Sequence, residues 1–173
     1  MTSEIYPSGN LQARACVLII AVSAFVLATA WAFELFGGFR PCALCLQQRE
    51  GYYAAIPMLA IAFTATALRW PSCVSRGLML VAGLMLATSF TTGVYQAGAE
   101  WGFWLGPSDC GGSTLPQVST GNLLDEIAET DVIFCDEAAL RVLGLSFAGW
   151  NVLSAGALMT ASIVAALWPP KRA

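Results

Sequence analysis

The chain has 173 residues, of which 57% are hydrophobic and only 11% are charged, and its net charge is −3. Few soluble domains have this composition, and several membrane spans are its usual explanation. Because the sequence contains no histidine, histidine acid–base chemistry and His-ligated metals or haem are excluded. No cluster of basic residues is present, so nucleic acid is not expected as a partner.

Four apolar stretches predict an all-α membrane protein, a four-helix transmembrane bundle that forms a single domain over residues 1–173. Each stretch approaches the roughly 20 residues that a helix needs to cross the hydrocarbon core. Ala28-Thr29-Ala30 resembles a signal-peptide cleavage site, but the length of the first stretch favours an uncleaved span. The four predicted spans are about residues 15–35, 43–68, 77–97 and 147–168.

The second stretch begins with a Cys-x-x-Cys motif, Cys42 and Cys45, which follows Pro41. Proline suits the first turn of a helix, so we expect both cysteines at or near a helix N-terminus. Unpaired N–H groups and the helix dipole favour a thiolate there. Arg49 lies four residues after Cys45 on the same helix face, and its cation can favour the same thiolate. The motif therefore predicts a redox-active dithiol.

Arg49 also has a simpler explanation, in which the aliphatic part of its side chain lies in lipid and its guanidinium reaches the membrane interface. We favour a functional role because an ionisable residue within a span is by default a candidate site. Gln48, one residue earlier, could form a hydrogen bond with a bound electron acceptor.

A long loop, about residues 98–146, separates the third and fourth stretches and contains Cys110 and Cys135. Residues 121–129 within it predict a short amphipathic helix on the membrane surface. A disulfide between the two cysteines would close a 26-residue loop and stabilise it by ~3–4 kcal/mol, which is sufficient reason for a structural bond. Zinc is disfavoured because these cysteines are too far apart to form the second half of a ligand set.

The basic residues predict the orientation of the bundle. Five of the eight lie on one side of a four-span arrangement, which the positive-inside rule assigns to the cytoplasm. Both termini are then cytoplasmic, and the loops at about 36–42 and 98–146 are periplasmic. Cys16 and Cys73 fall on the reducing side and are interpreted as bystanders. The five are Arg14, Arg69, Arg76, Lys171 and Arg172, against Arg40, Arg49 and Arg141 on the other side.

The run Pro-Cys-Ala-Leu-Cys-Leu-Gln-Gln-Arg at the second span, with a separated cysteine pair in a long second outer loop, resembles the disulfide bond formation protein B (DsbB) family. The resemblance extends over nearly the whole chain. It implies a thiol:quinone oxidoreductase of the bacterial inner membrane. Such an enzyme reoxidises a periplasmic, DsbA-like disulfide donor with a thioredoxin fold and passes the electrons to ubiquinone or menaquinone from the membrane pool.

The resemblance also implies a role for each outer cysteine. Cys110 would form the mixed disulfide with the partner, and Cys135 would then exchange with Cys42. Cys45 would face the quinone with Arg49 beside it, so that Cys45, Arg49 and Gln48 are the expected quinone-binding residues.

Three other interpretations remain open. A vitamin K epoxide reductase-like enzyme also combines a helical bundle, a quinone and two cysteine pairs, but its Cys-x-x-Cys follows the loop pair, whereas here it comes first. A structural membrane protein with a permanently linked loop is the non-enzymatic alternative. A transporter is disfavoured because the spans lack polar residues at the membrane midplane apart from a few serines and threonines, so no substrate path is visible.

Overall fold

The computed structural model describes residues 10–106 and 138–168, and these residues are mostly helical, as the sequence predicts. The surface helix predicted at 121–129 lies outside the described residues. The helices are α1 (Asn10–Leu35), α2 (Ala43–Ala67), α3 (Ser72–Glu100) and α5 (Phe147–Leu167), and two short strands are β1 (Arg141–Val142) and β2 (Leu145–Ser146).

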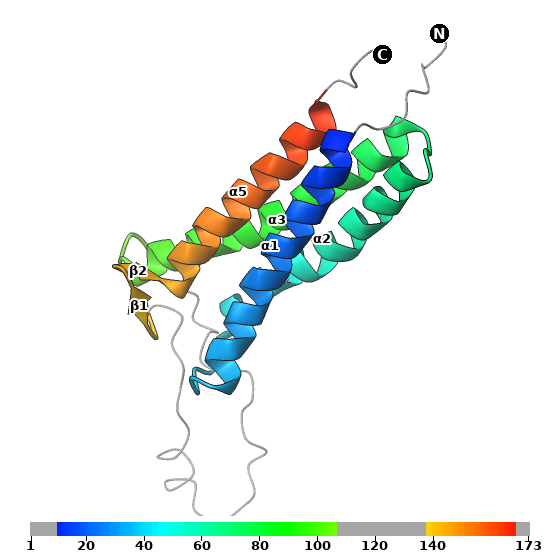
Figure 1. The fold of residues 1–173 in the computed structure, drawn as a ribbon. Helices are drawn as coiled ribbons and strands as arrows, with labels where there is room; N and C mark the ends of the chain where they lie inside the picture. Colours follow the sequence, from blue (N-terminus) through cyan, green and yellow to red (C-terminus); the bar gives the residue numbers. More distant parts are fainter. Residues whose placement is uncertain (1–9, 107–137, 169–173) are drawn as a thin grey trace, which may run out of the picture.

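The helices form an antiparallel bundle in which α2 packs on α3, α3 on α5, and α1 against both α2 and α5 (Figure 1). The start of α1, the end of α5 and the link between α2 and α3 lie at one end of the bundle. The connector between α1 and α2 lies at the opposite end. There the rings of Phe39 and Phe147 are in contact, with centroids 6.0 Å apart, so this connector packs against the start of α5.

Within the described residues, three helices are long and apolar enough to cross a membrane, at Leu11–Leu35, Ser72–Glu100 and Phe147–Leu167. The remaining expected span, at 43–68, coincides with α2, whose first two turns are polar and include Arg49 and Glu50. The four-span count therefore remains a prediction. Many outward-facing side chains are large and apolar, as the lipid-facing side of a bundle requires.

The helix bounds differ from the expected spans mainly at the ends. The third helix, expected at 77–97, runs from Ser72 to Glu100 and so extends about one turn further at each end. The first begins at Asn10 rather than near residue 15. These extensions include polar residues that are unfavourable in the hydrocarbon core but are compatible with a helix. Hydropathy therefore underestimates the lengths of α1 and α3, whereas the bounds of α2 and α5 agree with the predicted spans to within one residue.

The two-stranded hairpin before α5 was not predicted. Its two turn residues, Leu143 and Gly144, both have positive φ angles, of 53° and 85°, as a two-residue hairpin turn requires. Leu-Gly is not the usual sequence for this turn, so the sequence contains little signal for it. The hairpin leads directly to Ser146, whose hydroxyl accepts the backbone N–H of Gly149 and caps α5.

Small and hydroxyl-bearing residues allow the helices to approach closely, as is common in membrane bundles. Ser162 of α5 donates to the carbonyl oxygen of Met79 in α3 at 2.8 Å. Ser89 of α3 donates to the carbonyl oxygen of Gln48 in α2 at 2.6 Å, beside Gly51. These contacts hold the first part of α2, which carries the Cys-x-x-Cys motif, against α3.

We expect Gly51→Ala to destabilise the bundle by about 1–3 kcal/mol, because the added methyl group would collide with the backbone oxygen of Met85 and the hydroxyl of Ser89. The measurement is the thermal unfolding midpoint in detergent. Gly77→Ala is the matched control in α3, since a methyl group there meets no atom within 4 Å. Equal midpoints for the two variants would contradict close packing of α2 on α3 at Gly51.

Candidate redox site

Cys42 and Cys45 lie at the start of α2, where the sequence predicted them. Cys42 is the N-cap residue, and its sulfur accepts the backbone N–H of Cys45 at 3.3 Å. Pro41 lies just before the cap rather than in the first turn. The two sulfurs are unlinked and 2.6 Å apart. A pair this close can change between dithiol and disulfide with little movement of the chain.

The surroundings of the two sulfurs differ, and the difference decides which one carries a negative charge. The hydrogen bond to Cys45, followed by burial, raises the pKa of Cys42 above its ordinary value. Cys42 donates its thiol hydrogen to the Cys45 sulfur, which also accepts the side-chain amide of Gln96 at 3.4 Å. Cys42 therefore retains its proton and Cys45 is the sulfur that becomes the thiolate, which is the reactive form.

Gln96 of α3 is a site residue that the sequence analysis missed. Its side chain is 4% exposed and lies between Cys45 and Gln48. Its oxygen accepts the Gln48 amide at 2.6 Å, and its amide nitrogen donates to Glu100 at 3.2 Å. The available signal was an amide inside an otherwise apolar stretch, which is unfavourable in lipid unless it is bonded to a partner.

Arg49 forms an ion pair across two helices. Its Nη1 lies 2.6 Å from Oε2 of Glu34 in α1, and the Arg49 side chain is only 14% exposed. The simple interpretation, with the guanidinium reaching the interface, does not describe such an enclosed group. Because buried charges require a partner, Glu34 explains how Arg49 is held here, and the sequence did not suggest this pairing.

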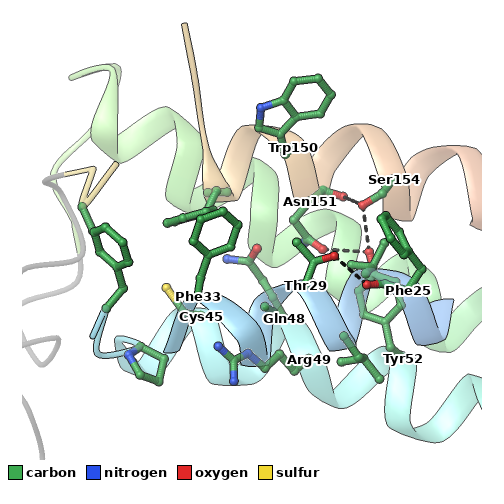
Figure 2. A pocket seen from close by; sticks show the side chains of 18 of the residues that line it. Phe25, Thr29, Phe33, Cys45, Gln48, Arg49, Tyr52, Trp150, Asn151 and Ser154 are labelled. Atoms are coloured by element: carbon green, nitrogen blue, oxygen red, sulfur yellow. Dashed lines mark hydrogen bonds between the residues drawn. The ribbon is translucent and has the colours of Figure 1, made fainter. Parts of the chain in front are cut away.

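A cavity of about 470 Å³ opens beside Cys45, between α1, α2 and α5. Its wall is mainly apolar, with Val22, Phe25, Phe33 and Phe147 among the lining residues. Figure 2 shows Cys45, Gln48 and Arg49 along one part of the wall. A mainly apolar pocket with a few polar groups is typical of a small-molecule site.

A second polar group lines the same cavity further along. The hydroxyl of Tyr52 donates to Asn151 at 2.8 Å and lies 3.1 Å from the hydroxyl of Ser154 (Figure 2). Asn151 in turn donates to the carbonyl oxygen of Ser89 in α3 at 3.0 Å. Asn151 and Gln96 both lie near the ends of the predicted spans at 147–168 and 77–97, away from the expected midplane.

The remaining cysteines are distributed as follows. Cys110 and Cys135, the predicted second pair, lie outside the described residues. Cys16 is buried in the core and Cys73 is exposed in the first turn of α3. The start of α3, which carries Cys73, lies at the end of the bundle opposite the start of α2 (Figure 1). The structure therefore brings together Cys42, Cys45, Gln48 and Arg49 of the predicted site.

A dithiol at a helix N-terminus, beside an apolar cavity in a bundle with membrane-length helices, defines a membrane thiol–disulfide oxidoreductase. A family model described as Disulfide bond formation protein DsbB matches residues 12–165. The chain belongs to this family, whose members are helical disulfide oxidoreductases of the bacterial inner membrane. No curated protein and no solved structure matches the chain significantly.

Proposed function

We propose that this protein is a thiol:quinone oxidoreductase that reoxidises a periplasmic thioredoxin-fold disulfide donor, similar to DsbA, and passes the electrons to a quinone. The observation that carries the proposal is the position of Cys45, which lies at the start of α2 and also lines the apolar cavity. A thiol in this position can exchange electrons with a small molecule in the cavity and with Cys42 behind it.

The residues of the cavity fit a quinone. A quinone is a flat, apolar ring with two carbonyl oxygens, and the wall offers aromatic surfaces together with polar groups. Arg49 would donate to an oxygen near Cys45, and Gln48 lies between them along the same helix. When bound, a quinone supplies the oxidising power and accepts two electrons and two protons. The acceptor would be ubiquinone or menaquinone from the membrane pool.

The chain's own residues would transfer electrons in pairs. A partner thiolate would attack the Cys110–Cys135 disulfide at Cys110, forming a mixed disulfide and releasing Cys135 as a thiolate; the second partner thiol would then release the oxidised partner and leave Cys110 and Cys135 reduced. Cys135 would next attack the Cys42–Cys45 disulfide at Cys42 and release Cys45 as a thiolate, and attack by Cys110 on Cys135 would restore the Cys110–Cys135 disulfide and leave Cys42 and Cys45 reduced. Closing the Cys42–Cys45 disulfide again releases two electrons and two protons, for which a bound quinone would supply the acceptor.

The proposed topology has four spans, with both termini in the cytoplasm and the reactive cysteines on the periplasmic side. In its support, the first turns of α1, the link between α2 and α3 and the first turns of α3, which carry Arg14, Arg69 and Arg76 respectively, lie at one end of the bundle (Figure 1). That end is opposite the connector leading to Cys42. The charge-free part of α2 after Glu50 would form the fourth span, with its polar start at the interface.

The test is quinone absorbance after the purified protein is mixed with a reduced thioredoxin-fold oxidase. We expect the quinone signal to disappear as partner thiols are consumed, in a ratio of two thiols to one quinone. Cys110→Ser should stop turnover with the partner but leave quinone reduction by a small dithiol intact. If the quinone is unchanged with both reductants, the proposed function is wrong.

A further inference from the structure

We propose that Glu100 is a positioning residue that fixes the direction of the amides around Cys45, so that an N–H donor rather than a carbonyl oxygen faces the sulfur. Its relevance to turnover rests on the proposed function. The arrangement itself concerns only the reduced thiol, and can therefore be tested without any quinone.

The contacts form one continuous chain from α3 to α2. The Gln96 amide nitrogen donates one hydrogen to Oε1 of Glu100 at 3.2 Å and the other to the Cys45 sulfur at 3.4 Å. The Gln96 oxygen lies farther from the sulfur, at 3.7 Å, and accepts the Gln48 amide at 2.6 Å. Every polar atom of the Gln96 side chain is therefore engaged.

An amide can be turned over without changing its shape, because oxygen and NH₂ have almost the same size. Gln48 and Gln96 could therefore face each other in either sense. A carboxylate has acceptors only, so Glu100 requires the NH₂ of Gln96 on its side. The same NH₂ group then faces Cys45, and the Gln96 oxygen faces Gln48. While Cys45 carries its proton, Glu100 is the member of this chain of contacts that can only accept, so it holds the amides in this sense before the thiolate forms.

The position of Glu100 is unfavourable for stability. It is the last residue of α3, where the negative end of the helix dipole opposes a carboxylate. Its Oε2 is buried without a hydrogen-bond partner among the residues that the structure describes. Arg141 of β1 donates to the backbone oxygen of Glu100 at 3.5 Å and not to the carboxylate. Features that cost stability are expected at functional sites.

Glu100 also acts on Cys45 through its charge, which disfavours a nearby thiolate. Replacing the carboxylate by an amide therefore has two opposing effects on the sulfur. Loss of the negative charge favours the thiolate, whereas loss of directionality lets the Gln96 oxygen turn towards Cys45 and disfavours it. A double-mutant cycle separates the two, since the directional effect requires Gln96.

The cycle compares Glu100→Gln, Gln96→Leu and the double variant in the full-length reduced protein, without quinone. The readout is the iodoacetamide alkylation rate of Cys45 between pH 5 and 9, resolved from Cys42 by fragment-ion mass spectrometry. In the Gln96→Leu background, Glu100→Gln should accelerate alkylation, because only a negative charge is removed. With Gln96 present, the factor by which Glu100→Gln changes the alkylation rate should be smaller by about threefold or more than in the Gln96→Leu background, and the rate can even fall.

Equal effects of Glu100→Gln in the two backgrounds would overturn the proposal. If Glu100 had a purely structural role, Glu100→Gln would change the alkylation rate equally in both backgrounds and would lower the unfolding midpoint. The proposal instead expects the midpoint of Glu100→Gln to be at or above that of the wild type. The cycle is repeated with Gln96→Met in place of Gln96→Leu, and the interaction between positions 96 and 100 must have the same sign in both cycles.

Discussion

Replacing Cys45 by serine should abolish quinone reduction, lowering the rate by roughly a hundredfold or more, because a serine hydroxyl neither ionises at neutral pH nor forms a disulfide. Cys45 lines the cavity whereas Cys42 does not, which makes Cys45 the sulfur nearest to the proposed acceptor. The measurement is loss of quinone absorbance with a reduced partner.

Cys73→Ser is the matched control for this prediction. Cys73 is exposed in the first turn of α3, away from the dithiol, so its replacement should leave the rate unchanged. Retention of more than about half of the wild-type rate by Cys45→Ser would remove Cys45 from the proposed role. A large loss in the Cys73 variant would instead contradict its assignment as a bystander.

Replacing Arg49 by alanine should raise the apparent KM for quinone by about tenfold or more, with a smaller change in kcat. A hydrogen bond from a charged donor is worth about 1.5–3 kcal/mol, which corresponds to that factor. The guanidinium lies on the cavity wall and is only 14% exposed, so water competes weakly for it. The measurement is the initial rate as a function of quinone concentration at saturating partner.

Glu34→Gln is the informative companion of Arg49→Ala. It breaks the ion pair with little change of volume and leaves the guanidinium in place. Removal of one partner from an enclosed pair is destabilising, so the unfolding midpoint should fall, while the KM should change less than in Arg49→Ala. If the two variants raise KM equally, Arg49 would act by joining α1 to α2 rather than by contacting the quinone.

The sequence was most informative where local chemistry alone decides the structure. The Cys-x-x-Cys motif after Pro41 predicted a helix start, and Cys42 is indeed the N-cap of α2. Of the four spans that the long apolar stretches predicted, three are present among the described residues as helices long and apolar enough to cross a membrane. These features depend on residues close in sequence, so composition and spacing are sufficient to find them.

The sequence was least informative about pairs that the fold brings together. Gln96 is 51 residues from Cys45, and Glu34 is 15 residues from Arg49. Neither partner stands out in the sequence, since one amide or one carboxylate near the end of an apolar stretch also fits the interface. Only the packing of α3 and α1 against α2 makes them part of the site.

The hairpin before α5 shows a different limit. Leu143 adopts a positive φ of 53°, which a leucine rarely does, and the neighbouring strands contain only two residues each. No pattern of alternating residues can be recognised over so short a distance. The connection to Ser146 nevertheless fixes where α5 starts, and with it the cavity wall that Phe147 and Asn151 provide.

The cavity is lined by side chains that also lie on the outside of the bundle. Phe25 and Trp150 both contribute to its wall, and they are 72% and 41% exposed. On the proposed function, quinone would therefore enter sideways from the bilayer, and its mole fraction among the lipids would set its supply. Adding empty detergent micelles at constant protein and quinone should then slow turnover by surface dilution, even though no bulk concentration has changed.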